Sequence, residues 1–184
     1  MVIFATVGLP GSGKGEFARV AAEHNIPVVS MGDVIRAVCA ERGIDPATGH
    51  GTVARALRDE EGPTAVADRT APYVEDELAD EGAVVIDGLR SPAELSTFEE
   101  AFPGEEILVV AISAPFELRA ERLLERSRDH TDSDIQALRT REAREAGFGM
   151  TELIDMADIT LANTGTLTAF EADIERALAS HVSR

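Results

Sequence analysis

A glycine-rich stretch near the N-terminus limits the possible folds of this chain more than any other part of the sequence. Its members are Gly8, Leu9, Pro10, Gly11, Ser12, Gly13, Lys14 and Gly15. The spacing of a glycine, four residues and then Gly-Lys is typical of a phosphate-binding loop, because glycines let consecutive backbone N–H groups turn toward one anion. An apolar run at 2–7 precedes the stretch and a helical pattern at 13–24 follows it, so a bound anion would also lie at a helix N-terminus. This arrangement predicts an α/β protein that binds a phosphorylated ligand.

Lys14 is the only lysine of the chain, because sixteen of its seventeen basic residues are arginines. Arginine serves equally well at an exposed surface position, whereas a lysine in a phosphate loop reaches the terminal phosphates as a point charge. The alternative is a glycine-rich turn with a solvated lysine. That alternative accounts poorly for a lysine retained in a chain that otherwise lacks the residue.

Short apolar runs alternate with longer stretches of helical period, which is the pattern of a parallel sheet with crossover helices. Strands are expected at 2–7, 27–29, 83–86, 107–112 and 158–161. Helices are expected at 13–24, 32–42, 51–60, 64–80, 92–101, 115–128, 132–146 and 167–181. The mainly helical segment between the second and third strands is too long for a simple crossover and indicates an insertion. No linker or repeat divides the chain, so one domain is expected over 1–184.

The charge balance excludes some partners. Thirty-four acidic residues against seventeen basic ones leave a net charge of −17. Nucleic-acid phosphates require a basic face, so no nucleic-acid partner is expected. An acid-rich chain almost without lysine is typical of a halophile, where molar salt shortens the Debye length to about 3 Å and screens self-repulsion. A GC-rich genome would explain the arginines but not the excess of acid.

The sequence also predicts the compartment. No apolar run approaches the roughly 18–20 residues of a membrane span, and no basic residue precedes the apolar N-terminal run, as it would in a signal peptide. The single cysteine, Cys39, cannot form an internal disulfide, and the four histidines have no metal-ligand spacing. We therefore expect a cytoplasmic protein with no membrane partner, while its oligomeric state is not predicted.

Polar residues follow the third expected strand, where the chain reads Asp87-Gly88-Leu89-Arg90. A carboxylate at a strand end beside a phosphate loop is the usual ligand for Mg²⁺, directly or through water. A guanidinium fork suits a phosphate better than any other side chain. The alternative for Asp87 is a structural one, as the cap of the next helix.

A second arginine, Arg36, follows the strand at 27–29 and the dipeptide Gly32-Asp33. It could bind an anion, or it could pair with Asp33 or Glu41 on its own helix. The residues alone do not decide between these two interpretations.

Arginines also gather after the fourth strand. Arg119, Arg122 and Arg126 are spaced i, i+3, i+7 and share one helix face, where like charges repel unless an anion lies between them. Arg139 lies on the following helix. The alternative is an exposed pair of helices whose arginines are neutralised by neighbouring glutamates.

Together these segments resemble the P-loop kinases of the adenylate kinase and dephospho-coenzyme A kinase group, and most closely an archaeal adenylate kinase-like family. The resemblance rests on Gly13-Lys14-Gly15, Gly32-Asp33 with Arg36, Asp87-Gly88, Arg122 with Arg126, and the stretch 157–167. It implies a P-loop NTPase three-layer sandwich with a five-stranded parallel sheet in the order 2-3-1-4-5. It also implies a helical acceptor-binding insertion at 32–80 and a short lid at 119–145.

The resemblance further implies which residues bind ATP. Lys14 and the loop amides would hold its phosphates, and Asp87 would act as the metal ligand that orients Mg²⁺. Asn163 and Gly165, in the loop after the last strand, would lie against the adenine.

The remaining roles concern the acceptor and the transfer step. The resemblance places Arg36, Gly88 and Arg90 on the acceptor. The residues that would stabilise the transferred phosphoryl group are Arg122, Arg126 and Arg139.

The leading hypothesis is ATP-dependent phosphorylation of a nucleoside monophosphate or a similar small nucleotide, with ATP, Mg²⁺ and a small phosphorylated acceptor as partners. Gly15 and Glu16 stand where most such loops carry hydroxyl residues for Mg²⁺, and Met31 stands where adenylate kinases carry threonine. Two alternatives remain open. One is a dephospho-coenzyme A kinase, which the C-terminal stretch favours; the other is a nucleotide-binding switch or accessory ATPase that acts on a protein partner.

Overall fold

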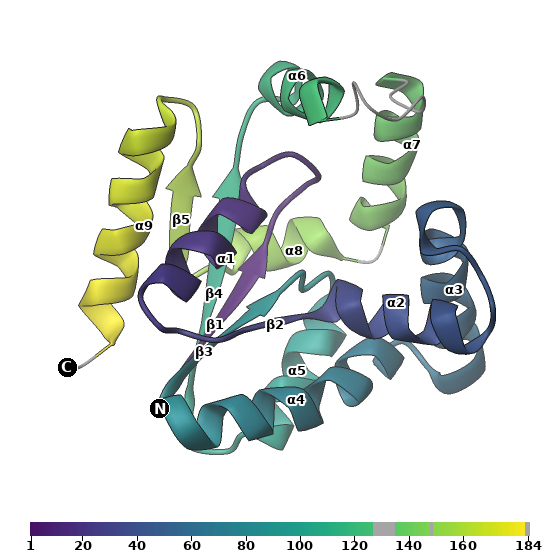
Figure 1. Cartoon of the computed structure of the whole chain (residues 1–184), viewed down its shortest axis with the longest axis horizontal. Coiled ribbons are helices and arrows are strands. Elements are labelled where there is room, and N and C mark those ends of the chain that lie inside the picture. The colour runs from purple at the N-terminus through teal and green to yellow at the C-terminus, as the bar shows by residue number, and fades with distance from the viewer. Residues whose placement is uncertain (127–134, 148, 183–184) are drawn as a thin grey trace.

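The computed structural model describes residues 1–126, 135–147 and 149–182. A parallel five-stranded sheet lies between two layers of helices (Figure 1). Its strands are β1 (Val2–Val7), β2 (Val28–Ser30), β3 (Ala83–Asp87), β4 (Glu106–Ser113) and β5 (Ile159–Ala162). Their order in the sheet is β2-β3-β1-β4-β5. The expected α/β class, the parallel sheet and the strand order are therefore confirmed.

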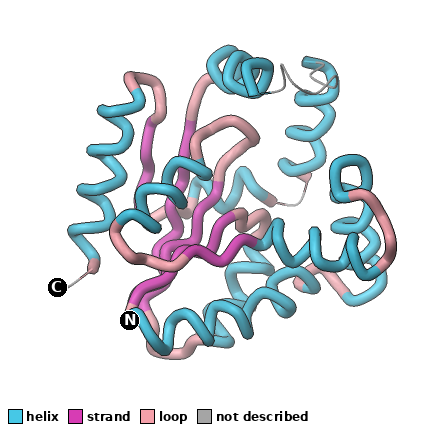
Figure 2. Tube along the Cα trace, in the orientation of Figure 1, coloured by secondary structure: helices cyan, strands magenta, loops and turns pink. Residues whose placement is uncertain are grey.

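Nine helices are assigned within the described residues. They are α1 (Lys14–Glu23), α2 (Met31–Glu41), α3 (Pro46–Glu61), α4 (Ala65–Glu81), α5 (Pro92–Ala101), α6 (Phe116–Arg126), α7 (Ile135–Ala146), α8 (Met150–Asp155) and α9 (Leu167–His181). Helices α1 and α9 cover one face of the sheet, and α4, α5 and α8 cover the other (Figures 1 and 2). Helices α6 and α7 lie beyond the carboxyl end of β4 (Figure 1).

Two apolar cores hold these layers together, one on each face of the sheet. Alternate residues of β1 point to opposite faces, so Ile3 and Ala5 enter the core beneath α2–α5 and α8, while Phe4 enters the core beneath α1 and α9. Every residue of β1 is buried, as expected of a central strand of a parallel sheet covered on both faces. The buried strand β1 thus holds the start of the glycine-rich loop in a fixed position.

Helix α3 begins at Pro46, five residues before the expected start at 51, and runs through Gly49 and Gly51. The expected start at 51 is therefore wrong. The Asp45 side chain caps the helix by accepting a hydrogen bond from the Ala47 amide at 2.9 Å, and Pro46 occupies the first turn, where it needs no amide donor. Capping and packing outweigh the cost of two glycines.

The short helix α8 was not expected, and the remaining elements agree with the sequence to within a few residues. The ends of the helices expected at 115–128 and 132–146, and the middle of the expected lid, lie outside the described residues. Over the part of the chain that is described, no helix combines the length and the apolar character needed to cross a membrane.

Candidate functional site

The glycine-rich loop joins β1 to α1 and packs tightly against its neighbours. A Cβ atom on Gly8 would lie 2.4 Å from the carbonyl oxygen of Ile112 in β4. Gly13 has a φ of 120°, and a Cβ there would lie 2.5 Å from the Asn163 side-chain nitrogen. Both positions therefore exclude any side chain, and only glycine lets the loop pack this closely against β4 and Asn163.

Three loop side chains have distinct surroundings. Lys14 begins α1, and its ammonium donates a hydrogen bond to the Gly8 carbonyl oxygen across the loop. Leu9 packs against the core below the loop. The Ser12 hydroxyl is buried and is the one buried side-chain polar atom, among those described, without a hydrogen-bond partner in the protein. An orphaned buried hydroxyl calls for a partner such as a ligand oxygen or a water, so the loop fits a phosphate group.

The two residues after Lys14 place no unpaired carboxylate and no bulky side chain beside the loop. Gly15 is exposed, and a Cβ there would contact nothing within 4 Å. The Glu16 carboxylate accepts a hydrogen bond from Arg19 Nε at 2.8 Å. This ion pair neutralises a carboxylate that would otherwise repel phosphate.

Asp87 ends β3 beside the loop. It lies opposite Thr6 of β1 in the parallel register, and the Thr6 hydroxyl donates a hydrogen bond of 2.8 Å to Asp87 Oδ1. Ser91, rather than Asp87, caps α5, because its hydroxyl accepts a hydrogen bond from the Glu94 amide. The helix-cap alternative for Asp87 is therefore wrong.

The surroundings of Asp87 fit Mg²⁺ held together with phosphates. No group of three or more potential metal-ligating side chains gathers anywhere within residues 1–126, 135–147 and 149–182. Mg²⁺ is usually bound by one or two carboxylates together with substrate phosphates and waters, and Asp87 can supply one carboxylate.

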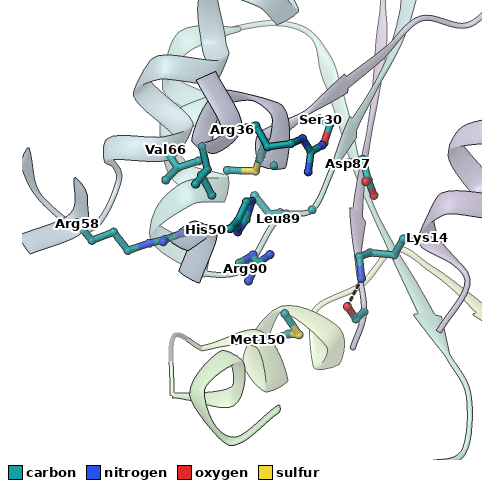
Figure 3. A pocket seen from close by; sticks show the side chains of 15 residues that line it. Lys14, Ser30, Arg36, His50, Arg58, Val66, Asp87, Leu89, Arg90 and Met150 are labelled. Carbon is teal, nitrogen blue, oxygen red and sulfur yellow. Dashed lines mark hydrogen bonds between the residues drawn. The ribbon is translucent and has the colours of Figure 1, made fainter. Parts of the chain in front are cut away.

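A cavity of about 210 Å³ opens between the loop and the helical insertion (Figure 3). Lys14 and Asp87 lie toward one end of it, and Arg36, Arg58 and Arg90 also line it. Four of the seventeen basic residues of the chain thus face one cavity. Its apolar wall is formed by Met31, Ile35, Val66, Leu89 and Met150. A ligand with several negative charges and an apolar portion fits such a lining.

The acceptor residues expected from the sequence are brought together in this cavity. Arg36, Gly88 and Arg90 all line it. Arg36 also pairs with the exposed Asp33 of its own helix, with a distance of 2.7 Å between Arg36 Nε and Asp33 Oδ1. Because exposed ion pairs contribute little free energy, this pair can give way to a stronger anion.

Two arginines of α6, Arg119 and Arg122, contact the loop backbone and do not line the cavity. Arg119 is buried, donates to the Pro10 carbonyl oxygen at 3.2 Å and forms an ion pair with Glu142 of α7. Arg122 donates to the main-chain and side-chain oxygens of Asn163 at 3.1 and 3.0 Å. Neither arginine lines the cavity, so a role of Arg122 in transfer remains a prediction.

The other predicted residues of this region are placed as follows. The Arg139 guanidinium lies 4.9 Å from the centre of the Phe116 ring, and the Arg126 side chain lies outside the described part of the chain. Asn163 is buried, and its side-chain amide donates to the Ser12 carbonyl oxygen at 2.8 Å. Gly165 is exposed two residues further on. The structure thus places Asn163 in contact with the loop, and a Cβ on Gly165 would contact nothing within 4 Å.

The sequence did not indicate three polar residues around the cavity: Thr6, Arg58 and Glu94. Thr6 lies within an apolar strand, and its side chain is fully buried. Arg58 follows Leu57 and lies four residues after Ala54, both buried, so helical spacing places it at the edge of the buried face. That spacing is the signal that could have identified it.

Comparisons with known proteins agree with this arrangement. The AAA domain family matches residues 7–139. A UPF0200 protein from Halobacterium salinarum is 49% identical over 180 residues, which cover 98% of this chain and 94% of that protein. A UPF0200 protein from Pyrococcus horikoshii is 40% identical over 184 residues, which cover 99% and 98%. The crystal structure of TT1252 from Thermus thermophilus has a TM-score of 0.63 and 18% identity over 99% of this chain and 98% of that chain, a similarity of fold.

Proposed function

The chain belongs to the AAA domain family and to the archaeal UPF0200 family, and on that premise we propose that it is an ATP-dependent kinase that phosphorylates a nucleoside monophosphate or a similar small nucleotide. One observation carries the proposal. The phosphate loop and Asp87 share a cavity with Arg36 and Arg90, which belong to the insertion and to the segment after β3. A donor phosphate on the loop and an acceptor phosphate on the arginines would therefore meet in one cavity.

The residues of the loop side would hold the donor. The loop amides and Lys14 would bind the β- and γ-phosphates of ATP, once the Lys14 ammonium leaves the Gly8 carbonyl oxygen. Asp87 would hold Mg²⁺, which supplies charge neutralisation to the phosphates when it is bound. Thr6 would keep the Asp87 carboxylate oriented toward the metal.

The residues of the insertion side would hold the acceptor. Arg36 and Arg90 would bind its phosphate through charge-assisted hydrogen bonds. The apolar wall that includes Met31 and Ile35 would pack against the remainder of the acceptor. Phosphoryl transfer needs mainly positioning and charge stabilisation, and both are available here without a dedicated base.

The proposal includes the cytoplasmic location expected from the sequence. It also includes a cytoplasm that holds molar salt, because the chain is strongly acidic and retains one lysine. Activity should therefore be measured in molar potassium chloride. The salt concentration matters because, at a net charge of −17, repulsion between like charges lowers the stability of the folded protein in dilute buffer.

The test is a transfer assay with Mg·ATP and a panel of acceptors that holds the ribo- and deoxyribonucleoside monophosphates and dephospho-coenzyme A. We expect transfer to one class of acceptor and a loss of about a hundredfold or more in Lys14→Ala, because a charge that stabilises the transferred group is removed. Arg176→Ala, at an exposed position on α9, is the control and should keep full activity.

Two other outcomes would change the assignment. Lys14-dependent transfer to dephospho-coenzyme A alone would identify the second kinase hypothesis. ATP consumption that is the same with and without every acceptor would contradict the kinase proposal and favour the accessory ATPase.

A further inference from the structure

A buried ion pair joins the helical insertion to the segment that carries Arg90. Arg58 of α3 and Glu94 of α5 lie 2.6 Å apart, between Arg58 NH2 and Glu94 Oε1. The Glu94 side chain is fully buried, and 11% of the Arg58 side chain is exposed. Arg58 reaches the cavity from the side of α3 (Figure 3).

Glu94 makes a second contact that reaches the acceptor side of the cavity. Its other carboxylate oxygen, Oε2, accepts a hydrogen bond of 2.9 Å from the Arg90 amide. Arg58 in turn donates to the Ala54 carbonyl oxygen of α3 at 2.9 Å. One carboxylate therefore links α3, α5 and the main chain of Arg90.

Stability alone does not account for such a pair. Burying two charges costs desolvation free energy, and well-packed apolar residues often replace a buried ion pair without loss of stability. Its directional hydrogen bonds, by contrast, determine where the linked segments lie relative to one another. Here the linked segments are the two that supply Arg36 and Arg90 to the cavity, through the insertion and through the loop after β3.

We propose that Arg58 and Glu94 are positioning residues of the acceptor site. Glu94 holds the Arg90 main chain so that its guanidinium faces the cavity, and Arg58 anchors Glu94 while drawing the insertion toward the sheet. The inference rests on the proposed function, since it assigns the pair to acceptor binding. The donor side, built on the glycine-rich loop, lies outside this link.

Variants that separate positioning from stability provide the test. Arg58→Lys keeps the charge but loses the guanidinium fork. The double variant Arg58→Met with Glu94→Met removes both buried charges together, so it leaves no unpaired charge and should stay folded. The matched control is Arg42→Met, which breaks the exposed pair with Glu60 that also joins two parts of the insertion.

We expect the KM for the acceptor to rise about tenfold or more in both variants, because a small displacement of a binding group costs that much or more. The KM for ATP should stay within about twofold in the same variants, and Arg42→Met should change neither value. The proposal would be overturned if the double variant had the same KM for the acceptor as the original protein. Equal increases in both KM values would also overturn it.

A second readout does not depend on activity. Hydrogen exchange of the Arg90 amide should become about tenfold faster in Arg58→Lys, because Glu94 loses its anchor, and should stay unchanged in Arg42→Met. If the original protein transfers phosphate to no acceptor, the proposed function fails. The exchange rate of the Arg90 amide then remains as the test of whether Arg58 and Glu94 position Arg90. An exchange rate that is unchanged in Arg58→Lys would then refute the link between Arg58 and Arg90.

Discussion

The Thr6 hydroxyl restrains the orientation of the Asp87 carboxylate. The Thr6 hydroxyl occupies Oδ1 of Asp87, and the Thr6 side chain is fully buried between the strands and helices. A hydrogen bond to a charged group restrains its rotation and contributes about 1.5–3 kcal/mol. Thr6 therefore serves the proposed metal ligand as a positioning residue.

Thr6→Val removes this hydroxyl and keeps the shape of the side chain. We expect the Mg²⁺ concentration needed for half-maximal transfer to rise about tenfold, because outer residues that orient a metal ligand typically contribute that much. Unfolding in urea should report a loss of about 1.5–3 kcal/mol, the contribution of the lost hydrogen bond. Thr6→Ser, which restores the hydroxyl, should recover the Mg²⁺ dependence.

Thr97→Val is the matched control, because the Thr97 hydroxyl donates to a main-chain carbonyl on the exposed side of α5. It should leave the Mg²⁺ dependence unchanged. The same Mg²⁺ dependence in Thr6→Val as in the original protein would show that Asp87 needs no such restraint.

The sequence predicted Lys14 and Asp87 because each follows an apolar strand within a local pattern. It could not predict Thr6, since pairing between Thr6 and Asp87 depends on the register of two strands about eighty residues apart in the chain. The pairing of Arg58 with Glu94 was missed for the same reason, although helical spacing could have indicated that Arg58 lies at the edge of a buried face. Their contact joins helices from different crossovers, and local periodicity carries no information about it.

At the scale of elements, α6 supports the glycine-rich loop through hydrogen bonds to its carbonyl oxygens. Arg119 and Arg122 share a helix face, as the spacing predicts, but their partners are carbonyl oxygens of the loop and of Asn163, together with Glu142. These acceptors relieve the repulsion between the two arginines. Because these contacts use carbonyl oxygens of the loop, they do not compete for its amide groups.

Arg119→Met tests this support. The substitution keeps much of the apolar stem and removes the bonds to Pro10 and Glu142, so we expect a loss of about 2 kcal/mol in the free energy of unfolding, since Glu142 remains partly buried without its partner. The KM for ATP should also rise, because the loop loses one of its restraints. Urea denaturation and steady-state kinetics measure the two effects.

The control for this variant is Arg176→Met, which breaks an exposed i, i+3 pair with Asp173 on α9. It should change stability by less than about 0.5 kcal/mol. If Arg119→Met were as stable as Arg176→Met and bound ATP normally, α6 would not support the loop.

The elements themselves were largely predictable, and the exceptions have physical causes. The start of α3 was missed because Asp45 and Pro46 form a stronger local signal than Gly49 and Gly51. The six-residue helix α8 is too short for a periodic pattern to stand out. Its burial, with Met150 and Leu153 in the core, results from tertiary packing.

Across the whole molecule, charge is distributed unevenly. The chain carries a net charge of −17, yet Lys14, Arg36, Arg58 and Arg90 converge on one cavity. The acidic exterior repels anions in dilute buffer, whereas salt at high concentration screens that repulsion over short distances. The buried and half-buried contacts of the cavity are screened less, so the site can keep its preference for anions while the surface loses its repulsion.

This difference predicts how stability depends on salt. The thermal midpoint should rise between about 0.1 and 1 M potassium chloride, because the Debye length falls from about 10 to about 3 Å and the surface carboxylates cease to repel one another. The triple variant Glu75→Gln, Asp76→Asn and Glu77→Gln neutralises three consecutive exposed acids of α4. It should unfold at a higher temperature than the original protein at low salt and at a similar temperature at high salt. Equal salt dependence in the two proteins would show that salt acts through hydration of the whole surface rather than through repulsion between these charges.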